Sequence, residues 1–146
     1  MYSFERTEHL DIPLTVAYQV ASGIEKYHEF IYGMKPVNVL TRGNDYITVT
    51  FKNRLLGGSV RTTARFKKGR SIYFRQGSGP FKELSGHWIF DGNEEGVLVT
   101  FSTIISHKNF IIDKTLRALG DELCERVMKD FKRQAEKIIQ QTVVSS

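Results

Sequence analysis

The last third of the sequence carries a long apolar stripe that restricts the possible folds more than any other feature. From Phe110 onward, apolar residues recur at steps of mostly three and four, which is the period of one helix face. The stripe consists of Ile112, Leu116, Leu119, Leu123, Val127, Phe131, Ala135, Ile138 and Ile139. A helix of about 30 residues is about 45 Å long, too long to lie beside one strand, so we expect it to cross a sheet. Gly120 interrupts the stripe and predicts a bend or a close approach to another element.

The sequence before this helix alternates between apolar and polar residues in short segments, a pattern typical of strands with one buried face. Short Gly-containing turns between the segments predict an antiparallel meander. The expected strands cover residues 2–10, 37–40, 46–51, 59–66, 71–76, 79–90 and 97–105, with one turn at residues 55–58. Two short helices are expected after the first strand, at residues 13–22 and 24–30. The predicted fold is a two-layer α+β domain whose sheet is covered on one face by the last helix.

Composition limits the class of protein. The 146 residues suffice for one domain, and an apolar content of 40% suits an ordinary globular core. The single cysteine, Cys124, has no partner for an internal disulfide, which fits a reducing compartment. No apolar run approaches the roughly 20 residues of a membrane-spanning helix, and the first residues lack a targeting pattern. We therefore expect a single cytoplasmic domain over residues 1–146.

Motifs for catalysis and metal binding do not emerge from the sequence. The four histidines lack the spacing of a metal site. The glycines of the GSGP stretch at residues 77–80 lead into a strand, whereas a phosphate-binding loop leads into a helix. Glu83 and Asp91 do not form a convincing acid–base pair. We therefore predict no catalytic residues and no metal.

The net charge of +5 has two explanations, a solvated surface or attraction to RNA, the ribosome or acidic lipid headgroups. Arg61 and Arg65 share the polar face of one expected strand, and Arg75 joins them if the strand register allows. These three arginines are the candidate basic patch.

The segment GPFKELSGHWIF, residues 79–90, contains the only tryptophan of the chain. Trp88 shares a strand face with Gly86, so the largest side chain of the chain lies beside a residue that has no side chain. Either the core is irregular there, or the space accommodates a ligand. Thr62 and Thr103, on inner strand faces, are a second indication of an unfilled interior.

The same segment resembles the Gly-Pro-Phe-basic-x-Leu-x-Gly-x-Trp-x-Phe strand of the START-like, helix-grip (SRPBCC, polyketide cyclase-like) superfamily. The resemblance is to the branch that holds the coenzyme Q-binding proteins and the ribosome association toxin RatA. The strand is matched by Gly79, Pro80, Phe81, Lys82, Leu84, Gly86, Trp88 and Phe90. Its first-helix and last-helix signatures are matched by Val20, Ala21, Ile24, Glu25, Tyr27, Phe30, Phe131 and Ala135. His28 stands where the family has proline, and residues 31–36 replace a stretch rich in Pro, Trp and Cys.

This resemblance implies a helix-grip fold, in which a curved antiparallel sheet of about seven strands wraps around the C-terminal helix. It implies non-catalytic binding of a lipid or polyprenyl quinone in a cavity between sheet and helix, with no other cofactor. The candidate cavity residues are Tyr27, Phe30, Phe51, Phe66, Phe74, Phe81, Trp88, Phe101, Leu116, Leu119 and Leu123. The same side chains also fit an ordinary filled core.

The resemblance also implies an alternative function, a RatA-like protein that binds the large ribosomal subunit and blocks subunit association. In that case ribosomal RNA is the partner, and the basic patch matters more than the cavity. Peripheral contact with a membrane is a further expected interaction. Cyclase-like activity follows only from analogy with other members of the superfamily.

Overall fold

The computed structural model describes residues 2–52 and 58–145, with side chains described through Gln141. Its elements are β1 (Tyr2–Leu10), α1 (Leu14–Ser22), η1 (Ile24–Glu29), β2 (Asn38–Arg42), β3 (Tyr46–Lys52), β4 (Ser59–Lys67), β5 (Ser71–Ser78), β6 (Phe81–Asn93), β7 (Gly96–His107) and α2 (Phe110–Ser145). This order is the predicted one. The turn expected at residues 55–58 lies outside the described residues except for Gly58.

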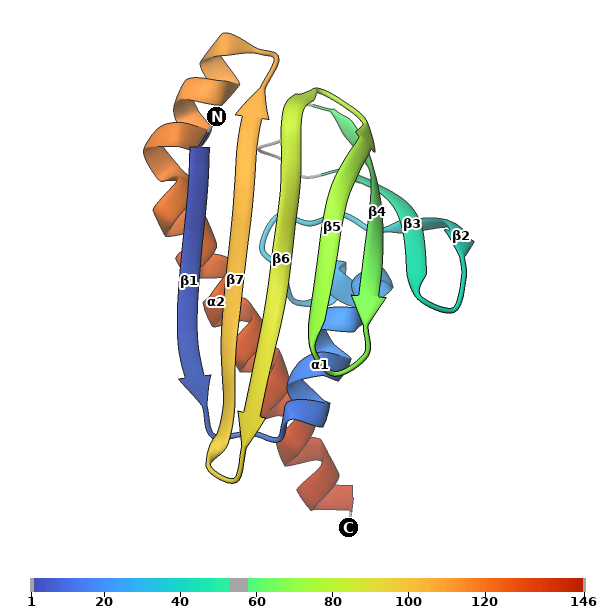
Figure 1. The fold of residues 1–146 in the computed structure, drawn as a ribbon, viewed down its shortest axis with the longest axis vertical. Coiled ribbons are helices and arrows are strands. Elements are labelled where there is room, and N and C mark those ends of the chain that lie inside the picture. Colours follow the sequence, from blue (N-terminus) through green and yellow to red (C-terminus); the bar gives the residue numbers. More distant parts are fainter. Residues whose placement is uncertain (1, 53–57, 146) are drawn as a thin grey trace.

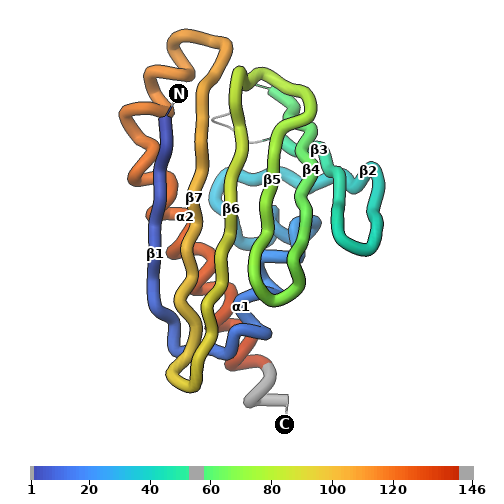
Figure 2. The backbone as a smooth tube through the Cα atoms, viewed as in Figure 1, coloured from blue at the N-terminus to red at the C-terminus, as the bar shows by residue number. Residues whose placement is uncertain are grey.

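Seven strands form one antiparallel sheet in the order β1-β7-β6-β5-β4-β3-β2 (Figure 1). Strands β2 to β7 follow one another as a meander, and β1 pairs with β7. Helices α1 and α2 lie on the same face of the curved sheet, and α2 crosses it diagonally (Figures 1 and 2). This arrangement confirms the predicted helix-grip α+β fold.

The second of the two short helices, η1, is a 3-10 helix. Ile24, Tyr27 and Phe30 are three residues apart, which is the period of that helix type. Gly23 separates it from α1, because the Gly23 N–H donates to the Gln19 carbonyl at 3.2 Å and closes the last turn of α1. The chain therefore turns here, and Ile24 and Tyr27 are directed toward the sheet.

Two side chains fix the start of α2. The side-chain oxygen of Asn109 accepts hydrogen bonds from the backbone N–H groups of Ile111 and Ile112, at 3.0 and 3.1 Å, and caps the helix. Asp113 accepts the His107 backbone N–H at 2.7 Å and the Tyr2 hydroxyl at 3.2 Å. The first turn of α2 is thereby joined to both β7 and β1.

Gly120 marks a close approach between α2 and β1. A Cβ atom at this position would lie 1.9 Å from Cζ of Phe4, so only glycine lets the helix backbone pack on that ring. Arg6, two residues further along β1, forms an ion pair with Glu125 at 2.7 Å. The helix continues without interruption through Gly120.

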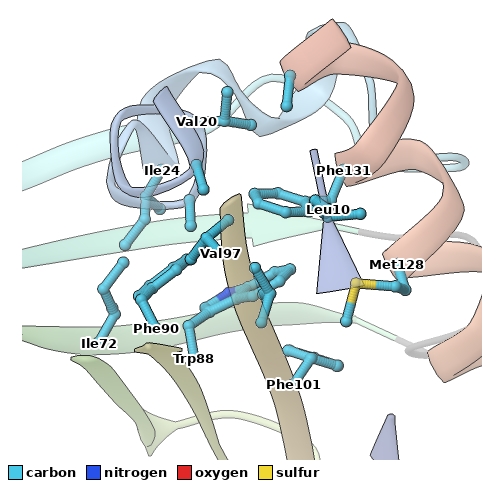
Figure 3. Close-up of a cluster of buried hydrophobic side chains, with 14 of the residues drawn as sticks. Leu10, Val20, Ile24, Ile72, Trp88, Phe90, Val97, Phe101, Met128 and Phe131 are labelled. Carbon is cyan, nitrogen blue, oxygen red and sulfur yellow. The ribbon is translucent and has the colours of Figure 1, made fainter. Parts of the chain in front are cut away.

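The core between sheet and helices divides into two clusters. Trp88 is at the centre of the larger one, where its ring centroid lies 4.7 Å from that of Phe101 and 4.8 Å from that of Phe131 (Figure 3). The smaller cluster lies between the sheet and the first part of α2. Its buried members are Val60, Phe81, Leu84 and Leu116.

Candidate ligand-binding cavity

An apolar cavity of about 150 Å³ lies within the larger core region. Strands β3 to β7 form its sheet side, and η1 with the segment at residues 31–37 forms the opposite side. Helix α2 contributes Val127. The resemblance implies a cavity between the sheet and the C-terminal helix. In the structure the cavity lies mainly between the sheet and η1 with the segment that follows it, and α2 reaches it only through Val127.

The structure places five of the eleven predicted cavity residues on the wall: Tyr27, Phe51, Phe74, Trp88 and Phe101. Each strand residue among them occupies an inward position of the sheet, as the alternation predicts. Trp88 pairs with Phe101 across the β6–β7 ladder, and Phe74 stacks on Phe101 with ring centroids 6.3 Å apart. These aromatic rings form a continuous wall on the sheet side.

Three predicted residues from the smaller cluster and its edge lie away from the cavity. Phe81 and Leu116 are buried in that cluster, and Leu123 packs against it. The reason is the diagonal path of α2, whose first half covers the smaller cluster (Figure 1). The cavity meets the helix one turn later, at Val127.

The three remaining predicted residues also lie elsewhere. Phe66 packs against the larger cluster without reaching the cavity wall. Phe30 packs edge-to-face on Tyr27, with ring centroids 5.6 Å apart, and lines a separate surface groove. Leu119 is half-buried and lies in neither cluster of described residues.

Several wall residues were not among the sequence-based candidates. Val127 belongs to the apolar stripe of α2, four residues after Leu123, so the helical pattern alone could have suggested it. Ile31, Met34 and Val37 lie between η1 and β2, outside any helix or strand. Their irregular backbone carries no period, and the sequence gives no signal that they face the cavity.

Gly86 does not itself open space beside Trp88, because the ring of Phe74 occupies that position. Phe74 pairs with Gly86 across the β5–β6 ladder. A Cβ atom on Gly86 would lie 2.2 Å from Cζ of Phe74. The missing side chain thus admits an aromatic ring, and that ring then forms part of the cavity wall.

The polar groups of the wall are few and uncharged. The Tyr27 hydroxyl donates a hydrogen bond to the Ala21 carbonyl. Burial raises the pKa of this hydroxyl above its ordinary range, the neighbouring Trp88 indole N–H makes a smaller contribution that lowers it, and the Glu25 carboxylate makes a smaller contribution that raises it. The hydroxyl therefore stays neutral. Among the described residues the wall contains no carboxylate, imidazole, amine or thiol, so the site is suited to an uncharged apolar molecule.

The predicted basic patch occupies the opposite face of the sheet. The β4–β5 register places Arg75 opposite Thr63, between Arg61 and Arg65, and all three arginines are exposed. The Arg65 guanidinium lies over the Tyr46 ring, 5.9 Å from its centroid. The three arginines therefore share one surface that is separate from the cavity.

Cys124 is buried, is not disulfide-bonded and lies outside the cavity wall. Burial, assisted by the charge of Asp121, raises the pKa of its thiol to about 11. Across residues 2–52 and 58–145, no three potential metal ligands come together. No helix in that part of the chain is long and apolar enough to cross a bilayer.

Residues 10–132 match the family model described as polyketide cyclase / dehydrase and lipid transport. The chain belongs to this family. The family description includes both catalytic and lipid-transport members. No curated protein matches the sequence.

Solved structures similar to this member of the polyketide cyclase / dehydrase and lipid transport family include both kinds of protein. The Zhui aromatase/cyclase from Streptomyces sp. R1128 has a TM-score of 0.80 and 15% identity, covering 94% of this chain and 95% of its own. The STAR-related lipid transfer protein from Xanthomonas axonopodis has a TM-score of 0.75 and 12% identity, covering 90% and 84%. The 18 kDa protein CC1736 from Caulobacter crescentus has a TM-score of 0.79 and 19% identity, covering 96% and 99%. At these identities the shared property is the fold.

Proposed function

We propose that this protein binds an uncharged apolar small molecule in the cavity and acts as a binding or carrier protein without catalysis. The observation that carries the proposal is an internal cavity of about 150 Å³ with an almost wholly apolar wall. Burial of each methylene group contributes about 0.8 kcal/mol, so such a wall binds apolar ligands with few polar contacts. The described wall residues include no carboxylate, imidazole, amine or thiol, which favours binding over cyclisation.

A polyprenyl quinone or another lipid is the ligand class that the resemblance to coenzyme Q-binding proteins favours. A dry protein cavity of about 150 Å³ holds a molecule the size of benzene. The ring of a quinone, or a short segment of a lipid, therefore fits the volume observed here. The rest of a long isoprenoid tail would lie outside the cavity.

The first experiment is extraction of the purified protein with organic solvent, followed by mass spectrometry, with an unrelated purified protein as control. We expect a stoichiometric quinone or lipid in the extract. An empty extract after incubation with membranes, together with no binding of short-chain ubiquinone, would contradict the proposal.

A matched pair of variants tests whether the ligand occupies this cavity. Ala64 is buried on the cavity wall, whereas Ala118 is exposed on α2. We expect A64L to fill the space and abolish binding of short-chain ubiquinone, measured by quenching of Trp88 fluorescence. A118L adds the same atoms at the surface and should leave binding unchanged. Equal binding by both variants would place the ligand elsewhere.

A second candidate function, binding to the large ribosomal subunit, is favoured by the three arginines on the outer sheet face. Basic side chains grouped on one surface attract the phosphates of RNA. We expect R61E/R65E to reduce co-sedimentation with large subunits and to leave quinone binding unchanged. The control K132E/K137E makes the same charge change on exposed positions of α2. Equal loss in both variants, or in neither, would argue against a specific patch.

Contact with an anionic membrane is supported by the start of α2. Phe110 and Ile111 are 77% and 73% exposed, the most exposed large apolar side chains among the described residues. Exposed Lys108 and Lys114 flank them and suit an anionic lipid surface. We expect F110S/I111S to reduce co-sedimentation with phosphatidylglycerol vesicles, while L98S, on the outer sheet face, has no effect. Unchanged co-sedimentation of F110S/I111S would contradict membrane contact at this site.

A further inference from the structure

Among the described residues of the cavity wall, Thr62 has a hydroxyl without a hydrogen-bond partner. Thr62 lies on the inner face of β4, is 6% exposed, and lines the cavity. Its hydroxyl oxygen is buried and has no hydrogen-bond partner among the described residues. Leaving a buried hydroxyl unpaired is unfavourable, and such groups in native proteins are usually satisfied by another protein group or an ordered water.

The neighbouring polar side chains are all engaged with other partners. Thr103, the other threonine on an inner strand face, donates its hydroxyl to the Ser85 carbonyl at 2.9 Å. Gln76, which pairs with Thr62 across the β4–β5 ladder, uses both ends of its amide on the backbone of Phe81. The Tyr27 hydroxyl already donates to a backbone carbonyl. Thr62 is therefore the wall group that remains available for a ligand.

We infer that Thr62 recognises a single hydroxyl or carbonyl oxygen on an uncharged, ring-sized ligand held in this cavity. The inference rests on the proposed function, since it requires that the cavity binds an apolar molecule. A threonine hydroxyl both donates and accepts, so it pairs with either kind of oxygen. In the structure the hydroxyl oxygen is buried within the wall, so contact with a ligand requires rotation about the Cα–Cβ bond, which exchanges the hydroxyl and methyl positions without moving the backbone of β4.

The surroundings of Thr62 also restrict the charge of the ligand. No charged side chain belongs to the described cavity wall, and an unpaired ion in an apolar cavity is strongly disfavoured. Carboxylates and phosphates are thus excluded from this part of a ligand. The volume of about 150 Å³ limits the enclosed portion to about one ring.

The test uses two probes of nearly equal size, p-cresol and toluene, which differ by one hydroxyl group. Their dissociation constants are measured by isothermal titration calorimetry with the wild-type protein and with T62V, which replaces the hydroxyl by a methyl group. We expect the ratio of the p-cresol dissociation constant to the toluene dissociation constant to rise about tenfold in T62V. This is the change that the loss of one buried hydrogen bond produces. Toluene should bind equally to both proteins.

Two control variants separate the hydroxyl from general effects of mutation. T62S keeps the hydroxyl and should retain the wild-type ratio. T63V removes a hydroxyl from the outer sheet face, where Thr63 bonds Thr48 at 2.9 Å, and should also retain it. If toluene binds but the ratio is the same in T62V and wild type, the role of Thr62 is wrong and the cavity proposal stands. If neither probe binds the wild-type protein, both proposals are wrong.

Discussion

Substitution of Gly86 by alanine tests the link between the sheet and the cavity. The added Cβ atom would lie 2.2 Å from Cζ of Phe74, whereas ordinary contacts at such a position begin at 3.4 Å. The ring must therefore retreat by at least 1.2 Å. Phe74 lines the cavity and stacks on Phe101, so its retreat either narrows the cavity or disrupts that stack.

Two opposing effects determine the stability of G86A. Overpacking a core costs about 1–3 kcal/mol. Replacing glycine in a strand interior contributes about 0.5–1 kcal/mol in the favourable direction. We expect a net loss of about 1–2 kcal/mol in the free energy of unfolding, measured by urea denaturation. We also expect weaker binding of toluene, measured by calorimetry.

Controls separate the contact with Phe74 from a general effect of alanine. In G77A the new Cβ atom would lie 3.8 Å from its nearest neighbour, the Arg61 carbonyl oxygen, so stability and binding should be close to wild type. The double variant F74L/G86A removes the ring that clashes. Its loss in the free energy of unfolding should therefore be smaller than the summed losses of F74L and G86A. If G86A unfolds at the wild-type urea concentration and binds toluene with wild-type affinity, the contact does not shape the cavity.

Three further predictions concern groups outside the cavity wall. Cys124 should react with a thiol reagent at mildly alkaline pH only as the protein unfolds, because burial raises its pKa to about 11; rapid reaction of the native protein would contradict this. The buried Asp130 carboxylate accepts a hydrogen bond from the Tyr32 backbone N–H at 3.0 Å, and D130A removes this acceptor. The free energy of unfolding, measured in urea, should fall by about 2 kcal/mol. An unchanged free energy of unfolding would show that this hydrogen bond does not stabilise the fold. The His107 backbone N–H lowers the pKa of Asp113, so this carboxylate stabilises the fold above its unfolded pKa, and the contribution disappears as the pH falls through the folded pKa. The free energy of unfolding, measured at a series of acidic pH values, should therefore depend less on pH in D113N than in the wild-type protein. Identical pH profiles would contradict this role of the Asp113 carboxylate.

Local patterns in the sequence were sufficient for the elements and the fold class. Alternation of apolar and polar residues depends only on neighbours along the chain, and it located β3 to β7 closely. The stripe of α2 likewise predicted one helix that crosses the sheet. Alternation also fixes the side of the sheet, so it placed Trp88 and Phe101 on the inner face, where both line the cavity in the structure.

The position of the cavity along α2 depended on the tertiary structure. The helical period gives the apolar face of the helix, but it does not say which turn meets which strand. Leu116 belongs to the same core cluster as Phe81, whereas Val127 reaches the cavity, because the helix crosses the sheet diagonally. The segment at residues 31–37 contributes to the wall through an irregular backbone that has no period to detect.

Alternation along each strand is enough to place Gly86, Trp88 and Thr62 on inner strand faces. The role of each residue there depends on how the strands pack together. The place beside Gly86 is filled by Phe74 from the neighbouring strand β5, while the hydroxyl of Thr62 has no hydrogen-bond partner in the part of the chain that the structure describes. Both outcomes depend on contacts between different strands and on the packing of side chains in three dimensions, and no pattern of neighbouring residues along one strand specifies either of them.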